Sequence, residues 1–68
     1  MTQTERIKAY MERFGSISPF EAFTDLGITK LATRIGEMRD DGVLIVSEWM
    51  EGKNRFGEKM RYKRYWLG

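Results

Sequence analysis

The spacing of apolar residues changes from a helical period to an alternating one near Gly42 of this 68-residue chain. Before this point, residues 7–14 carry apolar side chains at positions i, i+3, i+4 and i+7, which predicts an amphipathic helix. After it, VLIVSEWME (residues 43–51) alternates and is rich in β-branched residues, which predicts a strand. Helices followed by strands indicate an α+β chain that is mainly α.

Two capping boxes predict where the first two helices begin. Thr2 is followed by Glu5, and Ser18 is followed by Glu21, with Pro19 at the first helical position, where its missing N–H does no harm. Glycine ends each predicted helix because it adopts the left-handed backbone that closes a helix. The sequence predicts helices over Gln3–Phe14, about Pro19–Leu26 and about 30–41, ended by Gly15, Gly27 and Gly42.

The third predicted helix follows the second after Gly27-Ile28-Thr29, and Thr29 is its expected N-cap. Gly36 in its middle costs roughly 1 kcal/mol against alanine, which indicates close packing or the approach of a ligand. Ile17, between the first two helices, is expected to pair as a minimal strand. The helical spacing predicts that Ala22, Phe23 and Leu26 are buried in the second helix and Leu31, Ala32, Ile35 and Met38 in the third.

Residues 59–67 read as a strand that returns antiparallel to the first, after a loop of about six residues. Because strand side chains alternate, Arg61 and Lys63 share one face, and Arg64 lies on the other with Met60, Tyr62 and Trp66. We expect Arg64 to be structural and to pair with Glu48 or Glu51.

The aromatic residues of the hairpin are expected to be structural. Trp49, Tyr65 and Trp66 are expected to pack in the core or cover the sheet. Phe56, in the loop, either contacts nucleic acid or folds back on Trp49 or Tyr62.

The composition argues against catalysis, because the chain has no cysteine and no histidine. The candidates for nucleophile, general base and metal ligand are therefore reduced to carboxylates, serine, threonine and lysine, and disulfides are excluded. We expect no enzymatic activity, no cofactor and no small-molecule substrate. No apolar run approaches the roughly 20 residues of a membrane span, so we expect a cytoplasmic protein that does not contact membranes.

Half of the basic residues lie in one stretch near the C-terminus. Residues 53–66 (KNRFGEKMRYKRYW) contain six of the twelve lysines and arginines but only one acidic residue. Residues 1–51 carry six basic and nine acidic residues, a balance of −3, whereas residues 52–68 carry six and one, a balance of +5. This segregation is typical of a protein that binds a polyanion, although a merely solvated hairpin face is the alternative.

The order of elements supports the same interpretation. Two helices joined by a tight turn containing glycine form a helix-turn-helix unit, whose second helix enters the major groove of DNA. A basic hairpin directly afterwards gives the winged variant, in which the hairpin is the wing. We therefore expect one domain over residues 1–68, with the helix-turn-helix at about 18–42 and the wing at about 43–67.

Residues 17–67 also resemble a known family. ISPFEAFTDLGITKLATRIGEMR, followed by KNRFGEK and RYWL, is similar to the small winged helix-turn-helix domains encoded by bacteriophages and prophages. Repressor-type helix-turn-helix units prefer alanine at the position of Phe23, and this departure favours the winged variant. The resemblance implies a DNA-binding protein with a role in transcriptional regulation or as a recombination accessory factor.

Candidate DNA contacts follow from the helical and strand periods. Lys30, Thr33 and Arg34 are expected on the open face of the third helix, where arginine and lysine read guanine and threonine contacts a thymine methyl or a phosphate. Glu37 lies on the same face and is expected to be an exposed residue that does not contact bases. Phosphate contacts are expected from Lys53, Asn54, Arg55, Lys59, Arg61 and Lys63 of the wing. The expected partner is double-stranded DNA, and the alternative is a winged helix that binds a host or phage protein or another copy of itself.

Overall fold

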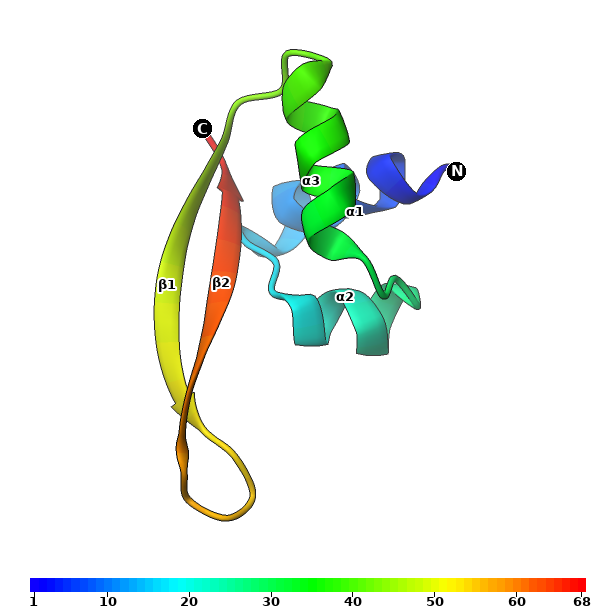
Figure 1. The fold of residues 1–68 in the computed structure, drawn as a ribbon. Helices are drawn as coiled ribbons and strands as arrows, with labels where there is room; N and C mark the ends of the chain where they lie inside the picture. The colour runs from blue at the N-terminus through cyan, green and yellow to red at the C-terminus, as the bar shows by residue number, and fades with distance from the viewer.

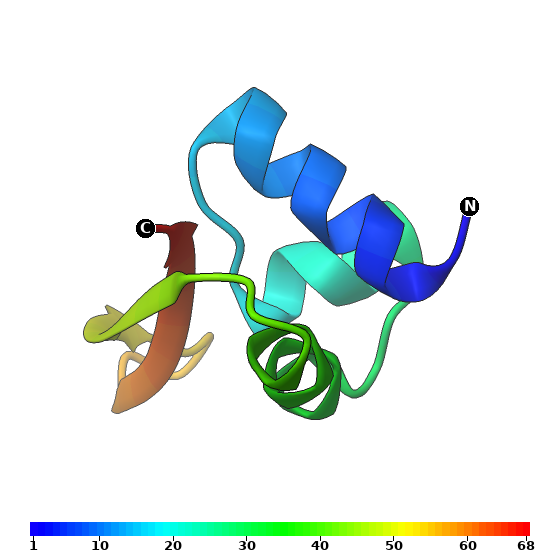
Figure 2. The same ribbon diagram turned by 90° about the horizontal axis from the view of Figure 1, so that it is seen from above.

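The computed structural model covers residues 1–68 and contains three helices followed by an antiparallel hairpin (Figure 1). The elements are α1 (Gln3–Phe14), α2 (Pro19–Leu26), α3 (Leu31–Asp40), β1 (Ile45–Lys53) and β2 (Lys59–Leu67). This order confirms the predicted α+β architecture. Figure 2, which looks along α3, shows the hairpin to one side of the three helices.

Both predicted capping boxes are present. The Thr2 hydroxyl accepts a hydrogen bond from the Glu5 N–H at 3.2 Å, and the Glu5 carboxylate accepts one from the Thr2 N–H at 2.9 Å. These bonds from Thr2 lower the pKa of Glu5 below its ordinary value. Ser18 and Glu21 make the equivalent pair at the start of α2. Local hydrogen bonding therefore sets where α1 and α2 begin.

The predicted start of α3 is wrong by one residue. Lys30, not Thr29, is its N-cap, and no side chain caps the helix. Gly27 ends α2 in the left-handed conformation, and the N–H of the next residue, Ile28, donates to the carbonyl of Ala22 at 2.9 Å. Ile28 is thus held at the end of α2 and buried, and the turn continues through Thr29 to the N-cap at Lys30.

Ten buried apolar side chains form one core that all three helices and the hairpin share. They are Ile7, Met11, Ile17, Ala22, Ile28, Leu31, Ile35, Met38, Ile45 and Tyr65. Burying each large member contributes about 1.5–3 kcal/mol against the entropy of ordering the chain.

Two predictions of burial are wrong, and one holds only in part. Phe23 is 59% exposed and Ala32 is exposed, whereas Leu26 is half-buried. Each wrong residue lies one position after a core residue, about 100° further around its helix. The buried stripe of these short helices is thus narrower than the spacing predicted.

The hairpin is tied to the helices at one end only. Ile17 pairs with Tyr65 through two backbone hydrogen bonds of 2.9 Å, as expected for a minimal strand. On the other strand, the Arg39 guanidinium donates to the carbonyl of Ile45 at 2.9 Å. Beyond these contacts the strands extend past α2 to a loop over residues 54–58 (Figure 1). The wing therefore projects from the helical body, and the whole molecule is 38 Å in its longest dimension.

Candidate nucleic-acid interface

The register of the hairpin gives its two faces different chemistry. Trp49 lies opposite Lys63, and Glu51 lies opposite Arg61, so these residues share one face, called here the cationic face. The other face carries Met60, Tyr62, Arg64 and Trp66, as the alternation predicted.

Trp49 organises the cationic face. The Arg61 guanidinium lies 4.8 Å and the Lys63 ammonium 5.3 Å from the centre of its ring. Each such contact contributes about 0.5–1 kcal/mol at an exposed site. Trp49 is 58% exposed, so it covers the sheet as predicted but is not in the core. The ring holds both cations at the surface without neutralising either charge.

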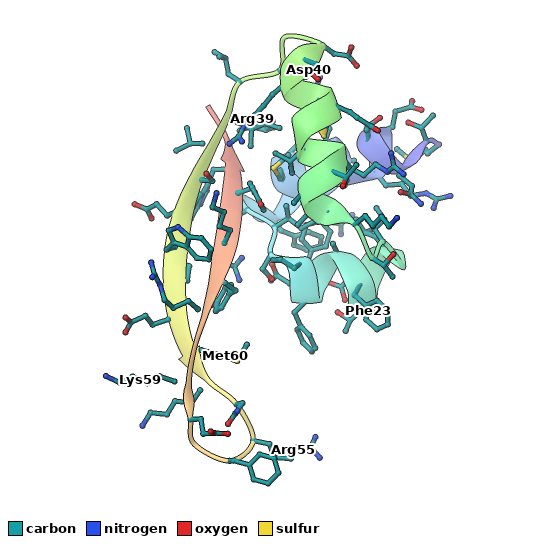
Figure 3. All side chains as sticks on the ribbon, viewed as in Figure 1. Phe23, Arg39, Asp40, Arg55, Lys59 and Met60 are labelled. Atoms are coloured by element: carbon teal, nitrogen blue, oxygen red, sulfur yellow. The ribbon has the colours of Figure 1, made fainter.

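Most hairpin cations have no acidic partner. The molecule contains two salt bridges, Arg34–Glu37 at 2.7 Å and Arg64–Glu21 at 2.9 Å. Five hairpin cations are therefore free of ion pairs: Lys53, Arg55, Lys59, Arg61 and Lys63. Figure 3 shows Arg55 and Lys59 near the free end of the wing. Unpaired cations clustered on one projecting element attract a polyanion.

Asn54 builds the wing loop. Its side-chain oxygen accepts hydrogen bonds from the N–H groups of Phe56 at 2.9 Å and Glu58 at 3.0 Å, and its amide donates to the Glu58 carboxylate at 3.1 Å. Phe56 is 87% exposed, so the prediction that it folds back onto Trp49 or Tyr62 is wrong. The ring of Phe56 instead lies exposed on the loop that Asn54 closes.

The candidate base-reading residues of α3 differ in whether other side chains of the molecule already bind them. Lys30 and Thr33 are exposed, at the N-terminal end of the helix. Arg34 is half-buried, and its guanidinium donates to both carboxylate oxygens of Glu37, at 2.7 and 2.8 Å, and to Gln3 at 2.9 Å. A Cβ added at Gly36 would meet nothing within 4 Å, so this glycine leaves the exposed side of α3 flat and does not serve close packing.

Arg64 joins the wing to the body. Its guanidinium donates to the Glu21 carboxylate at 2.9 Å and to the Ser16 hydroxyl at 2.8 Å. The expected partners Glu48 and Glu51 form no salt bridge with it, although Glu48 lies directly opposite on β1. The side chain instead reaches from β2 to the start of α2, where Glu21 is already fixed by its capping bond.

A comparison with protein-family models then identifies the architecture. Residues 2–68 match the model described as a winged helix-turn-helix domain. The chain belongs to this family. No curated protein and no solved structure matches the chain significantly. Winged helix-turn-helix domains are in general DNA-binding modules and are typically not enzymes, which agrees with the free cations on this wing.

One part of the winged-helix site was not foreseen. The stacking of Arg61 and Lys63 on Trp49 follows from cross-strand pairing, so the alternation of residues 59–67 against 45–53 contained the signal. No three His, Cys, Asp or Glu side chains are grouped as metal ligands. None of the helices has the length and apolar character that crossing a membrane requires.

Proposed function

We propose that residues 1–68 act as one domain that binds double-stranded DNA, with the wing on the phosphate backbone and α3 in the major groove. The observation that carries this proposal is the set of five hairpin cations without an acidic partner. Two of them, Arg61 and Lys63, are held in place by Trp49 before any ligand arrives, which lowers the entropy cost of contacting phosphates.

For base reading, Lys30 and Thr33 are the first candidates because no other side chain engages them. Arg34 reaches a guanine only after it leaves Glu37 and Gln3, so its contribution includes the cost of breaking those bonds. The flat surface at Gly36 lets the duplex approach the helix closely. Asn54 supports the wing loop and contributes to binding by fixing its shape.

The biological setting belongs to the same proposal. The similarity of residues 17–67 to phage and prophage domains supports a role in the cytoplasm of a bacterial host, as a transcriptional regulator or a recombination accessory factor. Both roles require DNA binding and no catalytic group, which suits a chain without histidine or cysteine.

The test is a fluorescence-anisotropy titration of random-sequence duplex DNA at low and moderate salt. The logarithm of the affinity should fall with the logarithm of salt at about −0.9 per neutralised phosphate, or about −4.5 if all five wing cations engage. Removing two of them, with Arg61→Ala and Lys63→Ala together, should weaken binding by about tenfold or more and reduce the slope by about 1.8.

Arg6→Ala and Lys8→Ala together supply the matched control, because both are exposed cations on α1 outside the wing and the charge removed is the same. This pair should leave both affinity and slope unchanged. Absence of binding at low salt would overturn the proposed function. Equal losses from the α1 pair and the wing pair would show that only net charge matters and would remove the wing from the site. Selection of duplex sequences should then be relaxed by Lys30→Ala and Thr33→Ala if α3 reads bases.

A further inference from the structure

A groove of about 600 Å³ separates the start of α2 from the wing. Phe20 lines it from α2, and Lys53, Met60 and Tyr62 line it from the wing. Phe20 is 75% exposed and Met60 is 45% exposed. Figure 3 shows Met60 on the wing, closer to Arg55 than to Asp40. Clustered exposed apolar side chains of this kind mark interaction surfaces.

This groove is poorly suited to DNA. Met60 and Tyr62 lie on the hairpin face opposite the cationic face. On the α2 side, Pro19 has no N–H to offer a phosphate, and the N–H of Glu21 is already bonded to Ser18. The Glu21 carboxylate adds a negative charge, which Arg64 balances. Lys53 is the exception, because it lines the groove and also lies on the cationic face, opposite Lys59. The rest of the groove stays open to a protein while the cationic face is on DNA.

The opposite end of the molecule carries the complementary chemistry. Asp40, Asp41 and Leu44 form an exposed acidic corner between α3 and β1, and Leu44 is 75% exposed. Neither carboxylate takes part in a salt bridge. Both lie at the C-terminal end of α3, where the helix dipole disfavours negative charge, so a cation from outside would stabilise them. Figure 3 shows Asp40 at the end of the molecule away from Arg55.

We propose that the acidic corner of one copy docks in the groove of the next, with Leu44 against Phe20 and Met60 and the carboxylates toward Lys53. Figure 3 shows Met60 of the groove far along the molecule from Asp40 of the corner, so the corner of one copy cannot reach its own groove. The contact is head-to-tail, and each added copy leaves one free groove and one free corner. Copies can therefore add one after another along DNA.

The size of the groove sets how strong this contact is. One corner in one groove buries much less than the about 1,200 Å² of a stable protein interface, so free copies associate weakly. On adjacent DNA sites the copies are held at high effective concentration, and the same contact then produces cooperative binding. This inference goes beyond DNA binding as such, because the contact also exists between copies in solution.

The first experiment uses the full chain without DNA. Amide resonances are followed by nuclear magnetic resonance as the protein concentration rises to about 1 mM. At this concentration, contacts with a dissociation constant of about 1 mM are detected. Concentration-dependent shifts are expected at Asp40–Leu44 and at residues 52, 53, 60 and 62. Phe20→Ser and Leu44→Ser each remove one side of the contact and should abolish the shifts at both ends. Phe14→Ser is the matched control, because Phe14 is 62% exposed and outside both patches.

The second experiment measures binding to duplexes with one site and with several adjacent sites. All three variants should bind the single site like the unmodified chain, because none of these residues belongs to the cationic face or α3. Phe20→Ser and Leu44→Ser should lower the cooperativity between adjacent sites by about fivefold or more, and Phe14→Ser should preserve it. An equal mixture of the two defective variants should recover cooperative pairs, joined through the one intact corner and groove, but not longer arrays.

The outcomes separate this proposal from the proposed function. Absence of concentration-dependent shifts, or shifts that survive both substitutions, overturns the head-to-tail contact whatever the DNA result. Binding of adjacent sites without cooperativity overturns it as well. Failure to bind any duplex, with the shifts intact, would sink DNA binding and leave the contact between copies standing.

Discussion

The helical body and the wing of this molecule use their side chains in opposite ways. In the body, helix side chains such as Ile7 and Ile35 are less than 2% exposed and pack into one core. In the wing beyond Ser47, no residue of β1 is fully buried, and the charged side chains of its free end have no acidic partner. The body thus specifies the fold, whereas the wing keeps its side chains for a ligand.

This division explains how so small a chain carries so much free charge. Repulsion among the wing cations acts beyond Ile45 and Tyr65, the two hairpin residues of the core, so it costs little folding free energy. Trp49 offsets part of the repulsion by accepting Arg61 and Lys63 on its ring. Substitutions in the body should therefore change stability, whereas substitutions in the wing should change binding.

The largest expected effect is on stability, from a substitution in the body. Ile35→Ala removes a side chain that is 1% exposed on α3 and should lower the free energy of unfolding by about 2–4 kcal/mol. A domain of this size has roughly 3–5 kcal/mol in total, so the variant should be largely unfolded at modest urea concentrations. Urea denaturation followed by circular dichroism measures the change.

The matched substitution in the wing is Met60→Ala, at a residue 45% exposed. It should change the free energy of unfolding by about 0.5 kcal/mol or less. Comparable losses at Ile35 and Met60 would mean that the wing contributes to stability as much as the core does, against the division described above.

The sequence predicted best what is decided by neighbours along the chain. The starts of α1 and α2 follow from bonds between residues three apart, as with Thr2 and Glu5, and their ends follow from Gly15 and Gly27. The partition of the hairpin faces follows from strict alternation. These rules need no knowledge of tertiary structure, so the helical architecture and the wing were predictable.

The sequence predicted poorly what depends on contacts between distant elements. Arg64 binds Glu21, 43 positions away, and Arg34 binds Gln3, 31 positions away, so neither partner was visible in the local pattern. The exposure of Phe23 depends on how little of the short α2 the other helices cover. The sequence therefore predicted which cations form the candidate site. It did not predict which of these cations are bound to other side chains of the molecule and which are not.

A smaller effect is expected where body and wing meet, at Glu21. One of its carboxylate oxygens accepts from both the Ser18 N–H and Arg64, each at 2.9 Å. Glu21→Ala removes both bonds and should cost about 1 kcal/mol of unfolding free energy. Glu21→Gln keeps a capping side chain and loses only the ion pair, which is partly exposed and screened, so it should cost about 0.5 kcal/mol.

Denaturation at low and high salt checks the assignment for Glu21. The cost of Glu21→Gln should shrink as salt rises, whereas the additional cost of Glu21→Ala should not change. If both variants were equally stable at every salt concentration, the ion pair alone would account for the role of Glu21, and the capping bond would contribute nothing.

The smallest effect concerns a bond within the body, between α1 and α2. The Tyr10 hydroxyl donates to the Asp25 carboxylate at 2.6 Å, and this bond, first among the causes, raises the pKa of Tyr10 to about 12 from its ordinary 10.0. A pKa raised by folding means that the protonated hydroxyl stabilises the native state below about pH 10. That stability is lost as the pH rises from about 10 to 12.

Tyr10→Phe removes the hydroxyl and keeps the ring that stacks on Phe14 at 4.6 Å between centroids. It should cost about 0.5 kcal/mol near neutral pH, the low end for a hydrogen bond, because solvent screens this site. Urea denaturation at pH 7 and near pH 11 measures the difference between the variant and the unmodified chain. The difference should shrink near pH 11, because Tyr10 of the unfolded chain, with its ordinary pKa of 10.0, has then lost the proton that the native hydroxyl still holds. A difference that stays constant would mean that the hydroxyl bond to Asp25 contributes no stability to the contact between α1 and α2.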